Sequence, residues 1–363
     1  MIYLTFVIRL FAADWVSTTS RQQIVLRSRI ADCQRISVMM AIGNLRSAIG
    51  TLCVRAFRLP PANVSMANRK AILISNPRTG RYAARARKPI EQIVDRLTSL
   101  GVDTELANTT GPGHAADIAA RAAQNGTTDV IVAGGDGTIN EAIQGMAGTK
   151  ARLGIIPRGT ANVLARELRL PMDEDEATNV LARGRSRTIH FGVAIDEQSQ
   201  TSRYFLLMAG IGVDAAVVTD VVPSLKSRFG KAAFWLSGFS QLTRWNPPVF
   251  TVEIDKQQYQ ATFVAIGNAA RYGGDLAITP RARLDRAEFE VCIIQTTSRW
   301  RYLHLASQAL SNGLKENSSD VRFIKTDSVK AFGEAAVQVD GEVIGKLPMR
   351  FEIAPDSLEV IVP

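Results

Sequence analysis

Short apolar runs alternate with stretches of helical spacing between residues 71 and 157. The apolar runs are residues 71–75, 129–133 and 153–157, and residues 102–106 are a further predicted strand. The helical stretches between these strands are residues 89–100, 114–124 and 138–146. Strand and helix repeating in this order predict a parallel, doubly wound sheet, because consecutive parallel strands need a crossover connection. The run at 129–133 (DVIVA) has no polar residue after its aspartate, as expected for a strand covered by helices on both faces.

The sequence after about residue 187 has a different texture, with many runs of strand propensity and few helical stretches. The strand-like runs are residues 188–195, 204–209, 249–254, 259–266, 289–294, 321–324, 336–339, 349–353 and 358–362. Two helical segments, 224–244 and 299–312, interrupt them. The predicted fold class is therefore α/β: a doubly wound parallel-sheet domain over residues 66–187, followed by a mostly β, sandwich-like second domain over residues 188–363.

Residues 1–65 differ in composition from the rest of the chain. They include eight arginines, no lysine, no glutamate and two aspartates, so they carry +6 of the net charge of +9. They show no sustained apolar period, whereas Met66 is followed closely by the first predicted strand. We predict that the native chain starts at Met66 and that residues 1–65 are an N-terminal extension outside the fold. An organelle transit peptide is the alternative.

Charge, cysteine content and hydropathy exclude several classes of protein. The residues after 65 carry a net charge of only +3, so no nucleic-acid partner is predicted. Cys33, Cys53 and Cys292 have no CxxC spacing and no histidine at metal-ligand spacing, which indicates a reducing compartment rather than disulfides or zinc. No uncharged apolar run reaches the 18 residues expected of a spanning helix. We therefore expect a cytoplasmic location.

The segment Gly134–Thr138 (GGDGT) connects the third predicted strand to a helix. Its three glycines let backbone N–H groups approach a phosphate, and a helix N-terminus favours an anion. A carboxylate beside phosphates is repulsive unless a divalent cation lies between them, so Asp136 predicts a Mg²⁺–nucleotide rather than a bare anion. Thr138 and Glu141 have capping-box spacing, which predicts a helix start at Thr138. The alternative is a glycine-rich turn without a ligand.

The glycine segment belongs to a longer series of motifs. In chain order these are NPRTG at 76–80, TTGPGHA at 109–115, GGDGTINEAIQG at 134–145, PRGTAN at 157–162, GIGVD at 210–214, GN at 267–268 with YGG at 272–274, and VDGE at 339–342. This series resembles the bacterial diacylglycerol-kinase-type lipid kinases. Their superfamily also contains sphingosine, ceramide and NAD kinases and phosphofructokinases. The resemblance covers about residues 70–362.

The resemblance implies that ATP is the nucleotide, with Mg²⁺ as its cation. The implied nucleotide-binding residues are Asn76, Pro77, Arg78, Thr79, Gly80, Thr109, Thr110, Gly134, Gly135, Asp136, Gly137, Thr138, Asn140, Glu141, Gly159 and Thr160. Their loops follow parallel strands, whose carboxyl ends bind ligands at one edge of an open sheet. The resemblance also implies that DGE at 340–342 holds the general base. We favour Glu342, with Asp340 as its partner and Asp136 acting through the Mg²⁺. The residues alone would instead suggest a hairpin turn with two solvated acids.

One departure from the family pattern concerns a second, structural Mg²⁺. Relatives hold it with an LDDG-like stretch, where this chain has LDRAE at 284–288. Arg286 replaces an expected acidic ligand and leaves Asp285 as a weak candidate for a metal ligand. We expect the Arg286 guanidinium to pair with Asp285, Asp214 or another acid in place of the ion.

The predicted function is an ATP- and Mg²⁺-dependent lipid kinase that phosphorylates a lipid hydroxyl, with diacylglycerol as the expected acceptor. The expected partner is a lipid substrate at a membrane surface, to which the protein is peripheral, and a homodimer is left open. Basic and aromatic side chains in residues 224–244 fit a membrane interface or an ordinary amphipathic helix. An NAD kinase is one alternative, although it should lack PRGTAN as placed here. A non-catalytic nucleotide-binding regulator is another, which Arg286 favours and the acids of the two motifs oppose.

Overall fold

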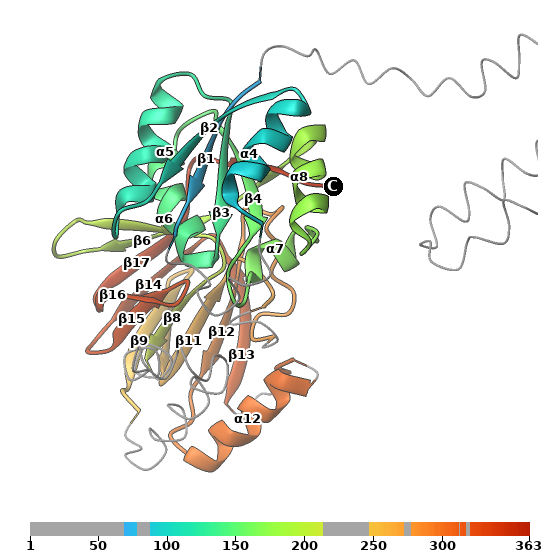
Figure 1. Cartoon of the computed structure of the whole chain (residues 1–363). Helices are drawn as coiled ribbons and strands as arrows, with labels where there is room; N and C mark the ends of the chain where they lie inside the picture. Colours follow the sequence, from blue (N-terminus) through green and yellow to red (C-terminus); the bar gives the residue numbers. More distant parts are fainter. Residues whose placement is uncertain (1–68, 78–87, 213–246, 272–276, 312, 317–319) are drawn as a thin grey trace, which may run out of the picture. The chain divides into compact units, whose positions relative to one another are not determined.

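The computed structural model describes residues 69–77, 88–212, 247–271, 277–311, 313–316 and 320–363 (Figure 1). The chain divides into two units, Met1–Met66 and Ala67–Pro363, and all described residues belong to the second. Several predictions concern residues outside this description. They are the start at Met66, the extension 1–65, the helix at 224–244, Asp214, and the nucleotide contacts of Arg78, Thr79 and Gly80.

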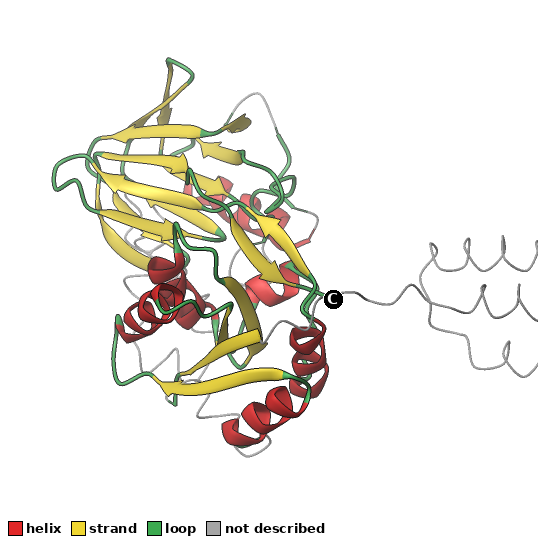
Figure 2. Ribbon diagram, turned by 90° about the horizontal axis from the view of Figure 1, so that it is seen from above, coloured by secondary structure: helices red, strands yellow, loops and turns green. Residues whose placement is uncertain are grey.

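The first sheet has the strand order β2-β1-β3-β4-β18-β5. Its strands are β1 (Arg69–Ser75), β2 (Val102–Asn108), β3 (Asp129–Gly134), β4 (Arg152–Pro157), β5 (Ser186–Ile189) and β18 (Leu358–Ile361). The strands β1 to β4 are parallel, as predicted. Helices α4 (Ile90–Ser99) and α8 (Glu174–Arg183) lie on one side of this sheet, and α5 (His114–Gln124) and α6 (Asp136–Met146) lie on the other (Figure 1, Figure 2).

The core of this α/β part lies between the sheet and its helices. Every residue of β3 is buried, and Leu73, Ile131 and Leu153 of three adjacent strands have no exposed surface. α5 and α6 pack closely, since a Cβ atom on Gly145 would lie 2.1 Å from the Ala116 carbonyl oxygen. Glycine at this position therefore sets the distance between the two helices.

A buried carboxylate joins the amino ends of three parallel strands. Asp129 has no exposed surface and pairs with Arg69 of β1 and Arg152 of β4. The Arg69 Nε lies 3.0 Å from one carboxylate oxygen, and the Arg152 Nε lies 2.7 Å from the other. The two guanidinium groups also donate to the carbonyl oxygens of Leu181 and Gly184 at the end of α8. This cluster ties the sheet to α8, at the end opposite the loops that follow β3 and β4.

The second part of the chain consists of two antiparallel sheets, as predicted for a sandwich. One has the order β10-β9-β14-β17-β6-β7, and the other β13-β12-β11-β8-β15-β16. Their strands are β6 (Gly192–Asp196), β7 (Ser202–Phe205), β8 (Met208–Gly212), β9 (Phe250–Ile254), β10 (Gln257–Ala261), β11 (Phe263–Gly267), β12 (Phe289–Ile294), β13 (Val321–Thr326), β14 (Ser328–Phe332), β15 (Ala336–Val339), β16 (Glu342–Lys346) and β17 (Met349–Ile353). Phe250, Phe351, Ile211 and Val337 from both sheets share one apolar core.

Three runs that we expected to be single strands are each two strands in different sheets. Residues 188–195 divide between β5 and β6, residues 204–209 between β7 and β8, and residues 259–266 between β10 and β11. The single-strand predictions are therefore wrong. Buried or partly buried side chains continue through each break, because both sides of the break face the core. Periodicity records burial, and it gives no sign that the hydrogen-bond partner of the backbone changes.

The last strand returns to the first sheet. β18 pairs parallel with β4 through Val360 and Leu153, and antiparallel with β5. A division of the chain at residue 187 thus does not follow the sheets, since β18 completes the α/β part. Helix α12 (Arg299–Ser311) packs on the sandwich, with Leu305 and Ala309 buried. In the part of the chain that is described, no helix has the length and hydropathy needed to cross a membrane.

Candidate active site

The loops that follow β3 and β4 are in contact. The Arg158 N–H donates to the Gly134 carbonyl oxygen at 2.9 Å, and a Cβ atom on Gly159 would lie 2.5 Å from the Gly135 Cα. A side chain at position 159 would push the two loops apart. The two glycine loops thus form one surface at the carboxyl ends of parallel strands, where an open α/β sheet binds its ligands.

Gly137 differs from Gly159, because there is open space next to its Cα atom. A Cβ atom on Gly137 would meet no atom within 4 Å. Gly137 is the second residue of α6, whose N-cap, Gly135, makes no side-chain capping bond. N–H groups in a first helical turn lack partners within the helix and attract anions. The glycines of this segment therefore fit a phosphate, which would occupy the space that a side chain would fill.

Asp136 binds the start of a neighbouring helix, α7 (Val163–Glu167). Its two carboxylate oxygens accept from the Val163 and Leu164 N–H groups, each at 3.1 Å. A carboxylate has about four acceptor positions, so these bonds leave room for a cation or water. The residue thus fits a nucleotide-bound Mg²⁺, and that role stays a prediction.

Glu141 of α6 binds the start of another neighbouring helix. Its carboxylate accepts from the Gly113 and Ala115 N–H groups at the N-terminus of α5, the second at 3.3 Å. The predicted capping box with Thr138 is therefore wrong: α6 begins two residues earlier, at Asp136, and has no side-chain cap. Capping-box spacing did not reveal that a packed neighbouring helix offers the carboxylate two free N–H groups.

The first two predicted loops lie beside the glycine segment. The Asn76 side-chain amide lies 3.4 Å from the Thr138 hydroxyl, which connects the loop after β1 to α6. Thr109 is buried, and its N–H donates to the Ser75 carbonyl oxygen. The Thr110 N–H donates to the His114 Nδ1 at 3.0 Å. Pro77 follows Asn76 in the loop after β1, and Thr160 is exposed in the loop after β4.

The DGE segment forms the hairpin turn between β15 and β16. Asp340 and Gly341 have φ values of +48° and +86°, as a two-residue primed turn requires. The Asp340 carboxyl is buried and accepts from three successive N–H groups, those of Leu206, Leu207 and Met208, at 2.7 to 3.0 Å.

Asp340 is therefore not the solvated acid that the residues alone suggested. The Asn140 side-chain amide donates a further hydrogen bond to its carboxyl, at 2.7 Å. Burial raises the pKa of Asp340, and these donors oppose the shift because they stabilise the carboxylate. Because its acceptor positions are filled by N–H groups, Asp340 holds the turn in place and has no free position for a substrate hydroxyl.

Glu342 is the accessible acid of this segment. Its side chain is 59% exposed, and one carboxylate oxygen lies 2.6 Å from an Arg203 Nη atom. The same Nη atom lies 3.3 Å from the Asn140 Oδ1. A chain of contacts thus connects Glu342 to α6 and, through Asn140, to Asp340. The motif search missed Arg203, which lies in β7, 139 positions before Glu342 in sequence and outside every motif.

Helix α6 is docked on the sandwich by another side-chain amide. Gln144 accepts from the Tyr204 N–H at 2.9 Å and donates to the Tyr204 carbonyl oxygen at 3.0 Å. It pairs with the backbone of β7, at the edge of its sheet, as a neighbouring strand would. The helix that begins in the glycine segment is therefore attached to the strand that carries Arg203.

The structural Mg²⁺ that relatives hold at this stretch does not fit the residues present, and Arg286 pairs with an acid as expected. Asp285 forms a bidentate pair with Arg283, at 2.8 and 2.7 Å. Arg286 pairs with another acid, Glu288, at 3.3 Å, and Lys325 lies 2.5 Å from the same carboxylate. The hydrogen bond from Arg283 lowers the pKa of Asp285. Among the described residues, no three His, Cys, Asp or Glu side chains form a metal cluster.

We expect the melting temperature of the nucleotide-free protein to be the same in EDTA and in millimolar Mg²⁺. An ion stabilises a fold only if it binds the native state, and each candidate ligand already has a cationic partner. Differential scanning calorimetry measures this, with NaCl at equal ionic strength as the control for charge screening. A rise of several degrees that is specific to Mg²⁺ would show that Asp285 and Glu288 hold an ion.

Two family descriptions match successive parts of the chain. Residues 70–194 match the diacylglycerol kinase catalytic domain, and residues 208–362 match the YegS C-terminal NAD kinase beta sandwich-like domain. The first match covers most of the α/β part, and the second covers the sandwich from β8 onward together with β18. The fold and the matches define a two-domain kinase.

Curated relatives specify the kind of kinase. The diacylglycerol kinase of Staphylococcus saprophyticus is 31% identical over 301 residues, which are 81% of this chain and 96% of that protein. The diacylglycerol kinase of Bacillus subtilis is 30% identical over 304 residues, or 81% and 97% of the two chains. The chain belongs to the diacylglycerol kinase family, and it is a lipid kinase.

A solved structure shares the fold. A diacylglycerol kinase from Bacillus anthracis superimposes with a TM-score of 0.62 at 20% identity, over 81% of this chain and 97% of that chain. At this identity the likeness concerns the fold alone. It agrees with a parallel α/β part followed by an antiparallel sandwich.

Proposed function

We propose that this chain transfers the γ-phosphoryl group of Mg²⁺–ATP to the hydroxyl of diacylglycerol, which gives phosphatidic acid and ADP. The observation that supports this most directly is the placement of Glu342. Its accessible carboxylate is connected by Arg203 and Asn140 to α6, the helix that begins in the glycine segment. The family supplies the kinase activity, and the named relatives supply the choice of acceptor.

The proposed reaction divides among residues of both parts of the chain. The N–H groups of the glycine segment and of the α6 N-terminus bind the phosphates. Mg²⁺, held by the nucleotide and by Asp136, would supply positive charge to the phosphate oxygens. The Glu342 carboxylate takes the proton of the lipid hydroxyl as its oxygen bonds to the γ-phosphorus, and the bond to the bridging β–γ oxygen breaks. Asp340 holds the turn that carries Glu342.

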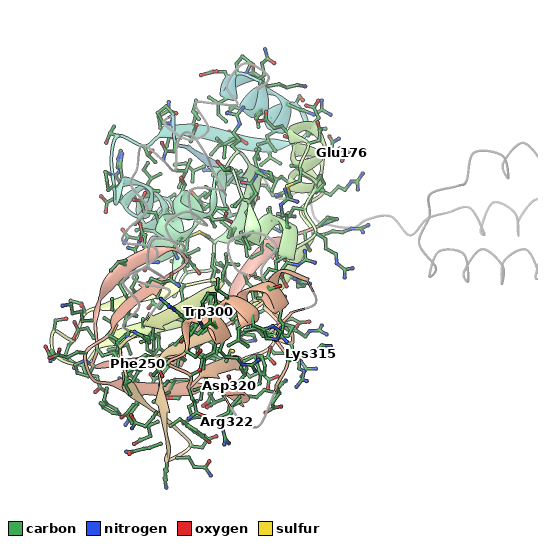
Figure 3. The ribbon with its side chains drawn as sticks, turned by 90° about the horizontal axis from the view of Figure 1, so that it is seen from below. Glu176, Phe250, Trp300, Lys315, Asp320 and Arg322 are labelled. Atoms are coloured by element: carbon green, nitrogen blue, oxygen red, sulfur yellow. The ribbon has the colours of Figure 1, made fainter. Side chains whose placement is uncertain are left out.

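A membrane surface is the proposed location of the acceptor. Trp300 at the start of α12 is 70% exposed, and the Arg299 guanidinium lies 5.4 Å from its ring centre (Figure 3). Tryptophan and arginine side chains together suit the boundary between lipid headgroups and acyl chains. These side chains support a peripheral contact of the enzyme with the bilayer that holds its substrate.

Labelled ATP with a panel of acceptors tests the proposed function. We expect transfer to diacylglycerol in vesicles and in detergent micelles, and loss of turnover in EDTA. Transfer to NAD in place of lipids would identify an NAD kinase. The family that matches the C-terminal part of this chain is named as NAD kinase beta sandwich-like. Equilibrium binding of ATP without turnover on any acceptor would instead identify a non-catalytic regulator.

Two glycine-to-alanine changes in α6 should affect different properties of the enzyme, one ATP binding and the other stability. Gly137→Ala should weaken ATP binding, measured as a higher KM for ATP, without loss of stability, because the new methyl enters the open space at the phosphate site. Gly145→Ala should lower the free energy of unfolding, because its methyl would lie 2.1 Å from the Ala116 carbonyl oxygen. An unchanged KM for Gly137→Ala would show that the nucleotide does not approach this turn.

A further inference from the structure

Arg203 holds two acceptors from different parts of the fold with one nitrogen atom. An Nη atom lies 2.6 Å from a Glu342 carboxylate oxygen in β16 and 3.3 Å from the Asn140 Oδ1 in α6. Arg203 itself belongs to β7, in the sheet opposite that of β16. The guanidinium therefore lies where α6 and both sheets of the sandwich meet.

The Nε atom of Arg203 makes this side-chain conformation costly. Its Nε is buried and has no hydrogen-bond partner among the described residues. A buried donor without a partner costs free energy, so this conformation has to be stabilised by other contacts. The contacts that the structure provides are those of the Nη atom with Glu342 and Asn140.

Asn140 connects this pair to the rest of the site. It is 4% exposed, and its amide nitrogen donates to Asp340 while its oxygen faces Arg203. The acceptor of the Arg203 bond therefore has a fixed position whenever α6 is docked. If α6 shifted, the guanidinium would lose one of its two acceptors, and Glu342 would lose the orientation that this pairing gives.

We propose that Arg203 is a positioning residue that couples the placement of α6 to the orientation of Glu342. The glycine segment begins α6, and Glu342 follows the turn of the DGE segment. The Arg203 guanidinium contacts both α6 and Glu342, so it fixes the position of the proposed base relative to a nucleotide bound at the glycine segment. This inference rests on the proposed function, in which Glu342 accepts the proton of the lipid hydroxyl.

Steady-state kinetics of Arg203→Ala at a temperature well below its melting temperature tests the coupling. We expect kcat to fall by about 10- to 100-fold, since a base displaced by roughly 1 Å can lose about 10²-fold in rate. The KM for ATP should change less than about twofold, because the N–H groups that bind phosphate are untouched. Arg203→Lys should recover part of the rate, since one ammonium can reach either acceptor but lacks the planar fork.

Arg350→Ala is the matched control. Arg350 pairs with Glu352 at 2.6 Å, both side chains are 34% exposed, and β17 lies in the same sheet as β7. This variant should keep the parent kcat. A kcat of Arg203→Ala within about twofold of this control would overturn the proposal, as would a loss of melting temperature with no change in kcat.

Two further variants separate this inference from the proposed function. The double variant Arg203→Ala/Asn140→Ala should lose clearly less kcat than the product of the two single losses, because both changes break one connection. Losses that multiply would contradict the coupling. If Glu342→Gln retains the parent turnover, the proposed base is wrong. If Glu342→Gln is inactive and Arg203→Ala is fully active, only the positioning role is wrong.

Discussion

Replacing Asp129 with alanine should lower the free energy of unfolding by about 3–5 kcal/mol, the cost of removing one partner from a buried ion pair. Asp129 is wholly buried, and its arginine partners are only 14% and 22% exposed. The change leaves Arg69 and Arg152 facing each other across three strands with no counter-charge. Denaturant unfolding followed by circular dichroism measures the loss.

An exposed pair provides the comparison for this prediction. Asp175 pairs with Lys88 at 2.6 Å, and these side chains are 39% and 47% exposed. Asp175→Ala should leave the unfolding midpoint nearly unchanged, because solvent screens exposed charges. Equal midpoints for Asp129→Ala and Asp175→Ala would show that the buried cluster does not hold the sheet to α8.

Glu342→Gln should lower kcat for lipid phosphorylation by about 10²–10⁴-fold, the usual contribution of a general base. Glutamine keeps the size of the side chain and an oxygen that can accept from Arg203, but it cannot take up a proton. The KM for ATP should stay near the parent value, because the lost interaction acts in the transition state. Initial rates with labelled ATP and diacylglycerol micelles measure the effect.

Glu352→Gln is the control for this change, since Glu352 is also paired with an arginine in the sandwich but lies outside the DGE segment. It should retain the parent kcat. A Glu342→Gln variant as active as this control would show that Glu342 is not the general base. Asp340 would be a poor replacement, because its carboxyl is buried and its acceptor positions are filled.

The α/β part could be predicted because its central strands β3 and β4 are buried on both faces. The apolar runs of these two strands are unbroken, and each is followed by a segment rich in glycine and small polar residues. Helix α8 was missed although it has local signals: Asp173 caps its N-terminus, acidic residues fill its first turn, and Gly184 ends it. Those signals could have found it.

The break between β7 and β8 could not be predicted in the same way. Leu206, Leu207 and Met208 continue an apolar run, but their N–H groups leave the ladder and bind Asp340. The interruption that periodicity hides is therefore the feature that holds the DGE turn. The role of Arg203 could not be predicted for a related reason. Its contacts depend on how segments distant in sequence meet, and they leave no local pattern.

The return of β18 to the first sheet has a consequence for biosynthesis. Leu153 of β4 pairs with Val360, which is synthesised roughly 200 residues later. Until then β4 presents an unpaired edge, a template for association between chains. A contact this distant in sequence also slows folding, because a long loop must close before it forms. We infer that the α/β part reaches its native state only after the sandwich has been synthesised, so neither part completes its folding before the end of translation.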